Sequence, residues 1–211
     1  MTPSMLSEWE LGKHSTSDKY RRRLAEYYAC PAEELFAHQD RAFGEPRLMV
    51  EYRALHQAML EVVTGAQRYL VVVGSRSRDR GYLDAIEATL TEHPDLVHYR
   101  ILFGPPRHRI LLEHLLRLID LRDPEDRSRG FKTLHITLID HITNPDLPER
   151  FFCANEHAAV VPVPSLNSAE NFDSGVVLGQ VAGTRYIDHV RQLYAAGRRV
   201  ETRTQLQALL P

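Results

Sequence analysis

The stretch Tyr69-Leu70-Val71-Val72-Val73-Gly74 decides the fold class of this chain of 211 residues. A continuous apolar run that is rich in β-branched residues and ends at a glycine is typical of a strand buried on both faces of a sheet. A second strand is predicted at 97–103, and the residues near 80–92 carry an amphipathic helical pattern. Strands that alternate with helices need crossover connections, so we expect an α/β fold with a mostly parallel or mixed sheet and helices on both faces.

The pattern extends in both directions from this core. Upstream, apolar residues at helical spacing predict a helix between residues 48 and 66; they are Leu55, Met59, Val62, Val63 and Ala66. Downstream, the predicted elements are a helix at 107–121, strands at 134–140, 150–154, 158–163 and 175–178, and a helix at 182–196. We therefore assign the α/β domain to residues 48–200 and expect residues 201–211 to form a peripheral tail.

The composition excludes several classes of protein. A hydrophobic content of 43% with 26% charged residues is that of a globular protein, and a net charge of −2 does not suit a protein that coats nucleic acid. Cys30 and Cys153 are far apart in the sequence, so neither a disulfide framework nor a zinc site is predicted. Because there is no long apolar run and no signal-like start, we expect a cytoplasmic protein with no membrane partner. The histidines lack the spacing of a metal site and no nucleotide-binding motif is present, so we expect no metal and no cofactor.

The first part of the chain, residues 1–36, is predicted to form short helices, and residues 37–47 a linker. Three segments of it are Ser7-Glu8-Trp9-Glu10-Leu11-Gly12-Lys13, Tyr20-Arg21-Arg22-Arg23-Leu24-Ala25-Glu26-Tyr27-Tyr28 and Pro31-Ala32-Glu33-Glu34-Leu35-Phe36. In order and spacing they resemble the second half of a Cro/repressor-type helix-turn-helix domain, as in the xenobiotic-response-element-like regulators. In that family the recognition helix ends in a Ser-x-Trp-Glu-x-Gly signature.

This resemblance implies a transcription regulator that binds DNA. The residues at the positions for base or phosphate contact are Thr2, Ser4, Ser7 and Lys13. The first two helices of such a domain would precede Thr2 and are absent from this sequence. A helix-turn-helix needs its first helix to hold the second one in the groove, so we expect the truncation to weaken DNA binding. The alternative is that the chain starts too late.

The C-terminal half carries a second resemblance. The strand Leu134-His135-Ile136-Thr137-Leu138-Ile139-Asp140 is followed by Ser165-Leu166-Asn167 and by Asn171-Phe172-Asp173. This order looks like that of a phospholipase D-like domain, in which a His-x-Lys-x-x-x-x-Asp strand precedes a Ser-x-Asn and an Asn-x-Glu element. The resemblance implies that His135 is the nucleophile if the protein is an enzyme. Since such domains often pair two halves, it also implies a homodimer.

The residues around His135 decide the expectation about catalysis. Thr137 stands where the family has its lysine, and Ile142 stands where it has its aspartate. A neutral hydroxyl cannot neutralise a phosphoryl oxygen, and loss of such a group commonly costs about 10²–10³ in rate. We therefore expect a domain that no longer catalyses phosphodiester transfer.

A binding pocket is predicted instead at the end of the first strand. Ser75 and Arg76 follow that strand, at the edge where open α/β sheets bind ligands, and an arginine beside backbone N–H groups suits a small anion. The remaining candidate ligand-binding residues are His135, Asn155, Glu156, Asn167, Asn171 and Asp173. The alternatives are that the loop after Gly74 is an ordinary polar loop and that His135 is structural.

Three hypotheses follow. The first is a transcriptional regulator-like protein whose non-catalytic α/β domain senses a ligand or mediates dimerisation. The second is a divergent phosphodiesterase or nuclease that uses His135. The third is a binding module whose N-terminal helices only pack.

Overall fold

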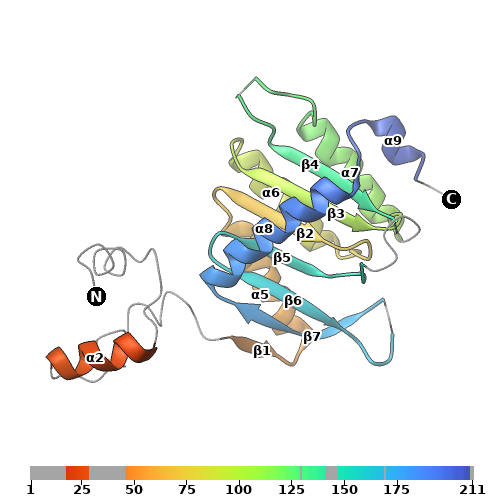
Figure 1. Ribbon diagram of the computed structural model, residues 1–211. Coiled ribbons are helices and arrows are strands. Elements are labelled where there is room, and N and C mark those ends of the chain that lie inside the picture. The colour runs from red at the N-terminus through yellow and green to blue at the C-terminus, as the bar shows by residue number, and fades with distance from the viewer. Residues whose placement is uncertain (1–17, 29–45, 129, 141–146, 169, 210–211) are drawn as a thin grey trace. The chain divides into compact units, whose positions relative to one another are not determined.

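The computed structural model describes residues 18–28, 46–128, 130–140, 147–168 and 170–209 (Figure 1). The chain divides into two compact units, Met1–Glu45 and Pro46–Pro211. In the first unit, helix α2 (Asp18–Tyr28) lies within residues 1–36, where short helices are predicted, and the rings of Tyr27 and Tyr28 meet edge to face at 5.0 Å between centroids. The four predicted DNA-contacting residues, Thr2, Ser4, Ser7 and Lys13, lie outside the described residues.

The second unit is built on one eight-stranded sheet with the strand order β1-β7-β6-β5-β2-β3-β4-β8. Its strands are β1 (Arg47–Met49), β2 (Tyr69–Val73), β3 (Val97–Phe103), β4 (Leu134–Ile139), β5 (Phe152–Asn155), β6 (Ala159–Pro164), β7 (Phe172–Leu178) and β8 (Arg198–Arg199). The sheet is mixed, as the α/β prediction allowed, but it is not largely parallel. Among the described strands, only β2, β3 and β4 pair in parallel. The strands from β5 to β7 are joined by short connections without helices, which forces antiparallel pairing.

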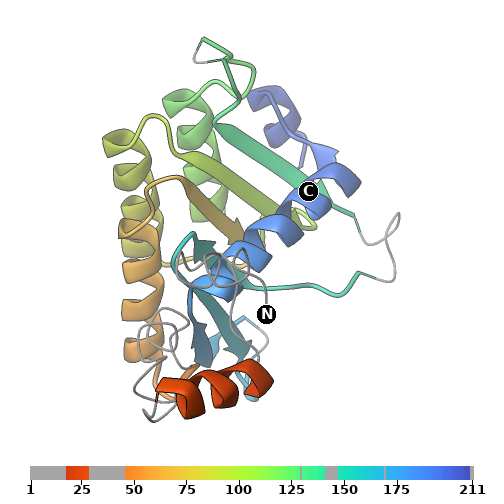
Figure 2. The same cartoon turned by 60° about the vertical axis from the view of Figure 1, so that its left-hand side comes forward.

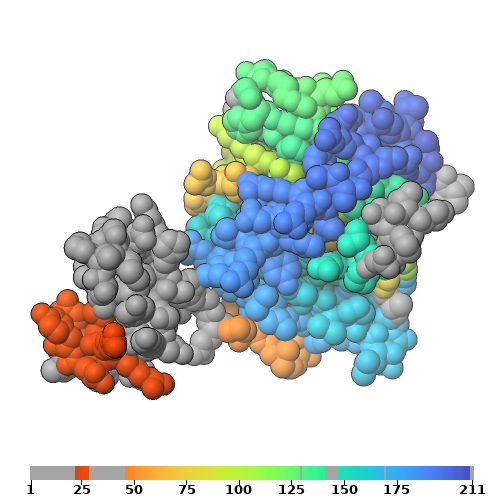
Figure 3. All heavy atoms as spheres, in the orientation of Figure 1, coloured from red at the N-terminus to blue at the C-terminus, as the bar shows by residue number. Residues whose placement is uncertain are grey.

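Helices cover both faces of this sheet, as predicted. They are α5 (Tyr52–Thr64), α6 (Arg80–Glu92), α7 (Arg109–Leu121), α8 (Gln180–Ala196) and α9 (Arg203–Gln207). In Figures 1 and 2, α5, α6 and α7 lie side by side on one face and α8 crosses the other. The space-filling view shows that α8 forms the outer surface over the middle of the sheet (Figure 3).

The buried residues of β2 show how the two faces are separated. Leu70 and Val72 belong to the core beneath α5, α6 and α7, whereas Val71 and Val73 belong to the core beneath α8. All four are at most 5% exposed, which is the burial on both faces expected for this strand. The fold class predicted from the stretch at 69–73 is confirmed.

The structure differs from the sequence prediction at the edges of the sheet. The sequence predicts a linker up to residue 47 and a helical segment after it. In the structure, Arg47–Met49 forms edge strand β1 against β7. The tail is not peripheral, because Leu206 of α9 and Leu209 are buried in the core on the α7 side. These short segments have too few residues to show a period, so only their packing defines them. In the part of the chain that the structure describes, no helix is long and apolar enough to cross a membrane.

Candidate functional site

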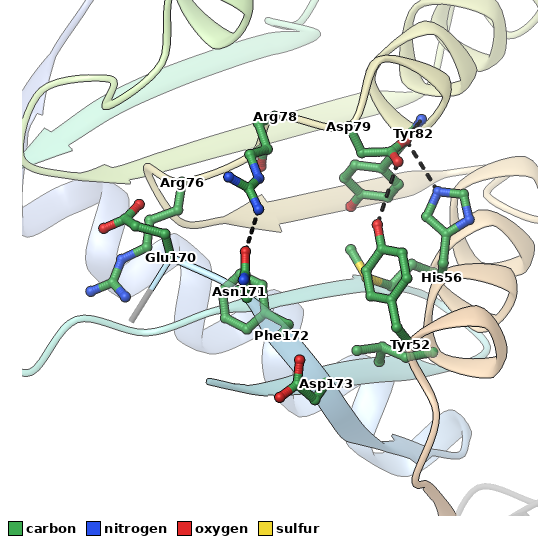
Figure 4. Close-up of a pocket in the computed structure, with 13 residues that line it drawn as sticks. Tyr52, His56, Arg76, Arg78, Asp79, Tyr82, Glu170, Asn171, Phe172 and Asp173 are labelled. Atoms are coloured by element: carbon green, nitrogen blue, oxygen red, sulfur yellow. Dashed lines mark hydrogen bonds and ion pairs between the residues drawn. The ribbon is translucent and has the colours of Figure 1, made fainter. Parts of the chain in front are cut away.

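A pocket of about 410 Å³ opens at the carboxyl end of β2, between the loop after that strand, helix α5 and the start of β7. Its lining residues are Tyr52, Leu55, His56, Met59, Arg76, Ser77, Arg78, Asp79, Tyr82, Glu170, Asn171, Phe172 and Asp173 (Figure 4). Gly74 turns the chain out of β2 with a φ of +130°, and a Cβ there would meet the Phe151 ring at 2.9 Å. The pocket therefore lies at the carboxyl end of the strand at 69–73, where a ligand site is expected.

The lining combines an apolar part with charged groups. Leu55, Met59 and Phe172 supply aliphatic and aromatic surface, and the Tyr52 side chain is 50% exposed. A mainly apolar pocket with a few polar groups is the usual composition of a site for a small organic molecule.

The two arginines of the loop have different electrostatic roles. The guanidinium of Arg76 forms an ion pair with Glu149 and lies 4.6 Å from the ring centroid of Phe151. Its charge is therefore largely compensated. Arg78, in contrast, is exposed and donates to the neutral amide oxygen of Asn171, so it keeps an uncompensated positive charge (Figure 4).

The carboxylates of the pocket also differ from one another. Glu170 accepts a hydrogen bond of 2.6 Å from Arg107, which in turn lies 3.2 Å from Glu149. Asp173 is exposed, and its carboxylate has no ion pair or hydrogen bond with any residue that the structure describes. One cation, Arg78, and one anion, Asp173, thus remain available to a ligand.

A third polar group consists of Asp79, His56 and Tyr52. Asp79 caps α6 by accepting the Tyr82 N–H at 2.7 Å, and it also accepts from His56 Nε2 at 3.1 Å and from the Tyr52 hydroxyl at 3.4 Å. Burial alone would raise the pKa of Asp79, but the hydrogen bonds from the Tyr82 backbone and His56 outweigh it and lower the pKa. This carboxylate already occupies the helix start, so that start is not a free anion site.

Tyr52, His56 and Asp79 were not predicted from the sequence as pocket residues. The signal for Asp79 was present, because an aspartate directly before a helical pattern is typical of an N-cap. No local signal points to Tyr52 and His56, since they reach the pocket only through the packing of α5.

His135 does not join this pocket. It lies on the opposite face of the sheet, where its ring stacks on Tyr99 at 4.3 Å and meets Tyr194 of α8 edge to face at 4.9 Å. Its Nε2 lies 3.1 Å from the Lys132 carbonyl oxygen, so Nε2 carries the proton and Nδ1 carries the lone pair. That Nδ1 is buried and has no partner among the described residues. Burial, helped by the charge of Lys132, lowers the pKa of His135 to about 4.

Four other predicted ligand-binding residues do not line the pocket, and three of them connect parts of the fold instead. The Ser75 hydroxyl is buried and reaches the carbonyl oxygens of Phe103 and Gly104 at 2.9 and 3.2 Å. Asn155 donates to the Val62 carbonyl oxygen at 2.7 Å and accepts from the backbone of the turn that follows it.

Glu156 and Asn167 complete this group. The Glu156 carboxylate accepts from the backbone N–H groups of Gln67, Arg68 and Tyr69 at 2.9, 3.1 and 3.2 Å. Asn167 is exposed in the turn between β6 and β7, and it does not line the pocket. Of the predicted ligand-binding residues, the structure therefore brings together Arg76, Asn171 and Asp173.

The pocket has no side-chain arrangement that fits a metal ion. Within the described residues, no group of three or more His, Cys, Asp or Glu side chains is placed to hold one.

Comparison with known proteins finds solved structures with a similar fold but no relative by sequence. No protein-family model matches the chain, and no curated protein sequence matches it. Nuc from Salmonella typhimurium, a phospholipase D family member, is 10% identical with a TM-score of 0.53 over 75% of this chain and 100% of its own. NucT from Helicobacter pylori is 9% identical with a TM-score of 0.53 over 74% of this chain and 99% of its own.

A third structure is more distant. TrmBL2, an archaeal chromatin protein, is 12% identical with a TM-score of 0.47, and the match covers 86% of this chain and 64% of TrmBL2. A likeness at this level is too low to support an inference. Nuc and NucT, each with a TM-score above 0.5, show that the fold resembles those of the phospholipase D family.

Proposed function

We propose that residues 46–211 are the ligand-sensing domain of a transcriptional regulator-like protein and that the ligand is a small molecule with an acidic group. The observation that carries this proposal is the pocket at the end of β2, in which Arg78 keeps an uncompensated charge beside apolar surface. An acidic group on Arg78 would form a charge-assisted hydrogen bond, the strong type for a guanidinium.

The second free charge narrows the class of ligand. Asp173 offers a carboxylate without a partner among the described residues, so the ligand is expected to present an N–H or O–H donor as well as its acidic group. The apolar part of the ligand would lie against Leu55, Met59 and Phe172. The sequence hypothesis of a small anionic ligand is thereby refined to an acid that also carries a hydrogen-bond donor.

The geometry of His135 argues against phosphodiester cleavage, the alternative function. A nucleophilic imidazole must present its lone pair to the substrate, whereas Nδ1 of His135 is buried. Thr137, at the position of the family's lysine, donates its hydroxyl to the Arg198 carbonyl oxygen at 2.9 Å. The fold shared with Nuc and NucT does not supply the chemistry, because one fold hosts many functions.

The regulator and homodimer parts of the proposal rest on the two resemblances. The Ser7–Lys13, Tyr20–Tyr28 and Pro31–Phe36 segments support a DNA partner, and the single phospholipase D-like half supports a second copy of the chain. DNA retention that falls steeply with added salt would support the first, and sedimentation as a dimer would support the second.

A panel of matched compounds tests the ligand proposal. Amino acids and aromatic hydroxy acids would be titrated by calorimetry beside the amides of their carboxyl groups, using wild type, Arg78→Met and Arg80→Met. Arg80 is the control because it is exposed on α6 and does not line the pocket. We expect acids to bind better than amides, and Arg78→Met to lose this preference while Arg80→Met keeps it. If no compound binds, or if Arg78→Met discriminates as wild type does, the proposal fails.

An activity assay separates the alternative. Hydrolysis of bis(p-nitrophenyl) phosphate by the wild type and its loss in His135→Ala would overturn the non-catalytic proposal. We expect no turnover above background in either protein.

A further inference from the structure

One buried cation next to the pocket has no role in the site described above. Arg100 of β3 is 0% exposed, and its side chain lies on the face of the sheet covered by α5, α6 and α7. Its Nη2 donates to the Gly74 carbonyl oxygen at 3.1 Å and to the Ser77 hydroxyl oxygen at 3.2 Å. Both acceptors belong to the loop that forms the pocket wall.

The charge of Arg100 is not compensated within the part of the chain that the structure describes. Its Nε and Nη1 atoms are buried without a hydrogen-bond partner there, and no ion pair of Arg100 is found. Burial lowers the pKa of Arg100 to about 10, which still leaves it charged at neutral pH. A buried cation without a partner is costly and uncommon, so its presence beside a pocket calls for an explanation.

Ser77 connects this cation to the pocket. Its hydroxyl oxygen accepts from Arg100, and its O–H proton has no acceptor among the described residues. Ser77 lines the pocket directly before Arg78 in the sequence. A hydroxyl whose oxygen is bound by a cation is a stronger donor than a free one, because hydrogen bonds in a chain polarise one another.

We propose that Ser77, Arg78 and Arg100 form an anion subsite at the wall of the pocket. An acidic group accepts from the Ser77 hydroxyl and from the Arg78 guanidinium, while Arg100 acts behind Ser77 as a positioning residue that holds the hydroxyl and adds positive potential. The subsite rests on the proposed ligand-binding function and assigns its acid-binding end. Carboxylate and phosphate share this chemistry.

The test uses the two simplest probes, sodium acetate and inorganic phosphate, at constant ionic strength. Backbone amide signals of the full chain would be followed by NMR in the wild type, Ser77→Ala and Ser77→Thr. We expect shifts at Ser77 and Arg78, affinity about ten- to hundredfold weaker in Ser77→Ala, and affinity restored in Ser77→Thr, which keeps the hydroxyl. Preference for acetate or for phosphate identifies the ligand as a carboxylate or a phosphate ester.

Unchanged affinity in Ser77→Ala would overturn the subsite. So would shifts at the exposed Arg109 as large as those at Arg78, which indicate an adventitious ion only. Arg100→Met should bind both anions about tenfold more weakly with Ser77 intact, whereas Arg100→Lys should retain binding. If Arg100→Met does not fold, the comparison of Ser77→Ala with Ser77→Thr decides alone.

The subsite and the proposed function can fail separately. If the matched compounds bind in an Arg78-dependent manner and Ser77→Ala has no effect, the function stands and the subsite falls. If no compound binds the pocket at all, both fall.

Discussion

The substitution Glu156→Gln distinguishes a structural from a ligand-binding carboxylate. Glu156 is a candidate ligand-binding residue by sequence, but its two carboxylate oxygens accept three backbone N–H groups at the start of β2, at 2.9–3.2 Å. The side chain is 18% exposed, so water cannot fully replace the carboxylate. We therefore expect this substitution to lower the free energy of unfolding and to leave the ligand pocket unchanged.

The magnitude follows from these hydrogen bonds. Glutamine keeps one oxygen acceptor and turns an NH₂ group toward N–H donors, so at least one charge-assisted bond is lost and another becomes unfavourable. At about 1.5–3 kcal/mol for a bond to a charged group, the loss is about 2–4 kcal/mol. For a unit of this size that corresponds to a fall in Tm of about 5–15 °C.

Urea unfolding and thermal unfolding of Glu156→Gln would be compared with wild type and with Glu61→Gln. Glu61 is an exposed glutamate of α5 whose carboxylate, among the described residues, accepts only a side-chain hydrogen bond from Gln57 at 3.4 Å, so we expect its variant to differ little from wild type in stability. The reasoning is refuted if Glu156→Gln unfolds within about 0.5 kcal/mol of wild type. It is also refuted if the variant keeps its stability and loses affinity for the compounds that bind the wild type.

Two further predictions concern His135 and α8. Because the folded pKa of His135 is lowered to about 4 from the model-compound value of 6.5, the unfolded chain takes up a proton first as the pH falls, and stability is lost between pH 6.5 and 4. Urea unfolding of His135→Phe over this range should show a shallower pH dependence, and an unchanged slope would argue against the buried neutral imidazole. Gly183→Ala places a Cβ 2.4 Å from the Asn155 carbonyl oxygen, so we expect the free energy of unfolding to fall by about 1–3 kcal/mol. Gly81→Ala, whose nearest contact would be an ordinary 3.4 Å, is its control in thermal unfolding, and equal stability of the two variants would contradict the close packing of α8.

The elements of the second unit were largely predictable from the sequence. The strands at 69–73 and 97–103 and the helix at 80–92 have the predicted bounds, because hydrophobic periodicity over five or more residues is a local property of the chain. The edge strand β1 and the short helix α9 were missed, since their few residues acquire structure only by pairing or packing.

The candidate site was predictable only in its location. A ligand site at the carboxyl end of β2, next to Arg76, is predicted from the alternation of strands and helices. The sequence does not show that Glu149 compensates the charge of this arginine. The resemblance to the phospholipase D-like motif grouped His135 with Asn171 and Asp173, whereas the structure puts His135 on the face beneath α8.

By itself the sequence determined the α/β class, the central strands and the edge where a ligand pocket forms. Only the tertiary structure decided which charges are free, because a charge is compensated by neighbours that are remote in the chain. Arg76 pairs with Glu149 and Glu156 meets Gln67, pairs that are separated by 73 and 89 positions. No local pattern encodes such pairs, and the first of them is why Arg76 is compensated while Arg78 remains available in the pocket.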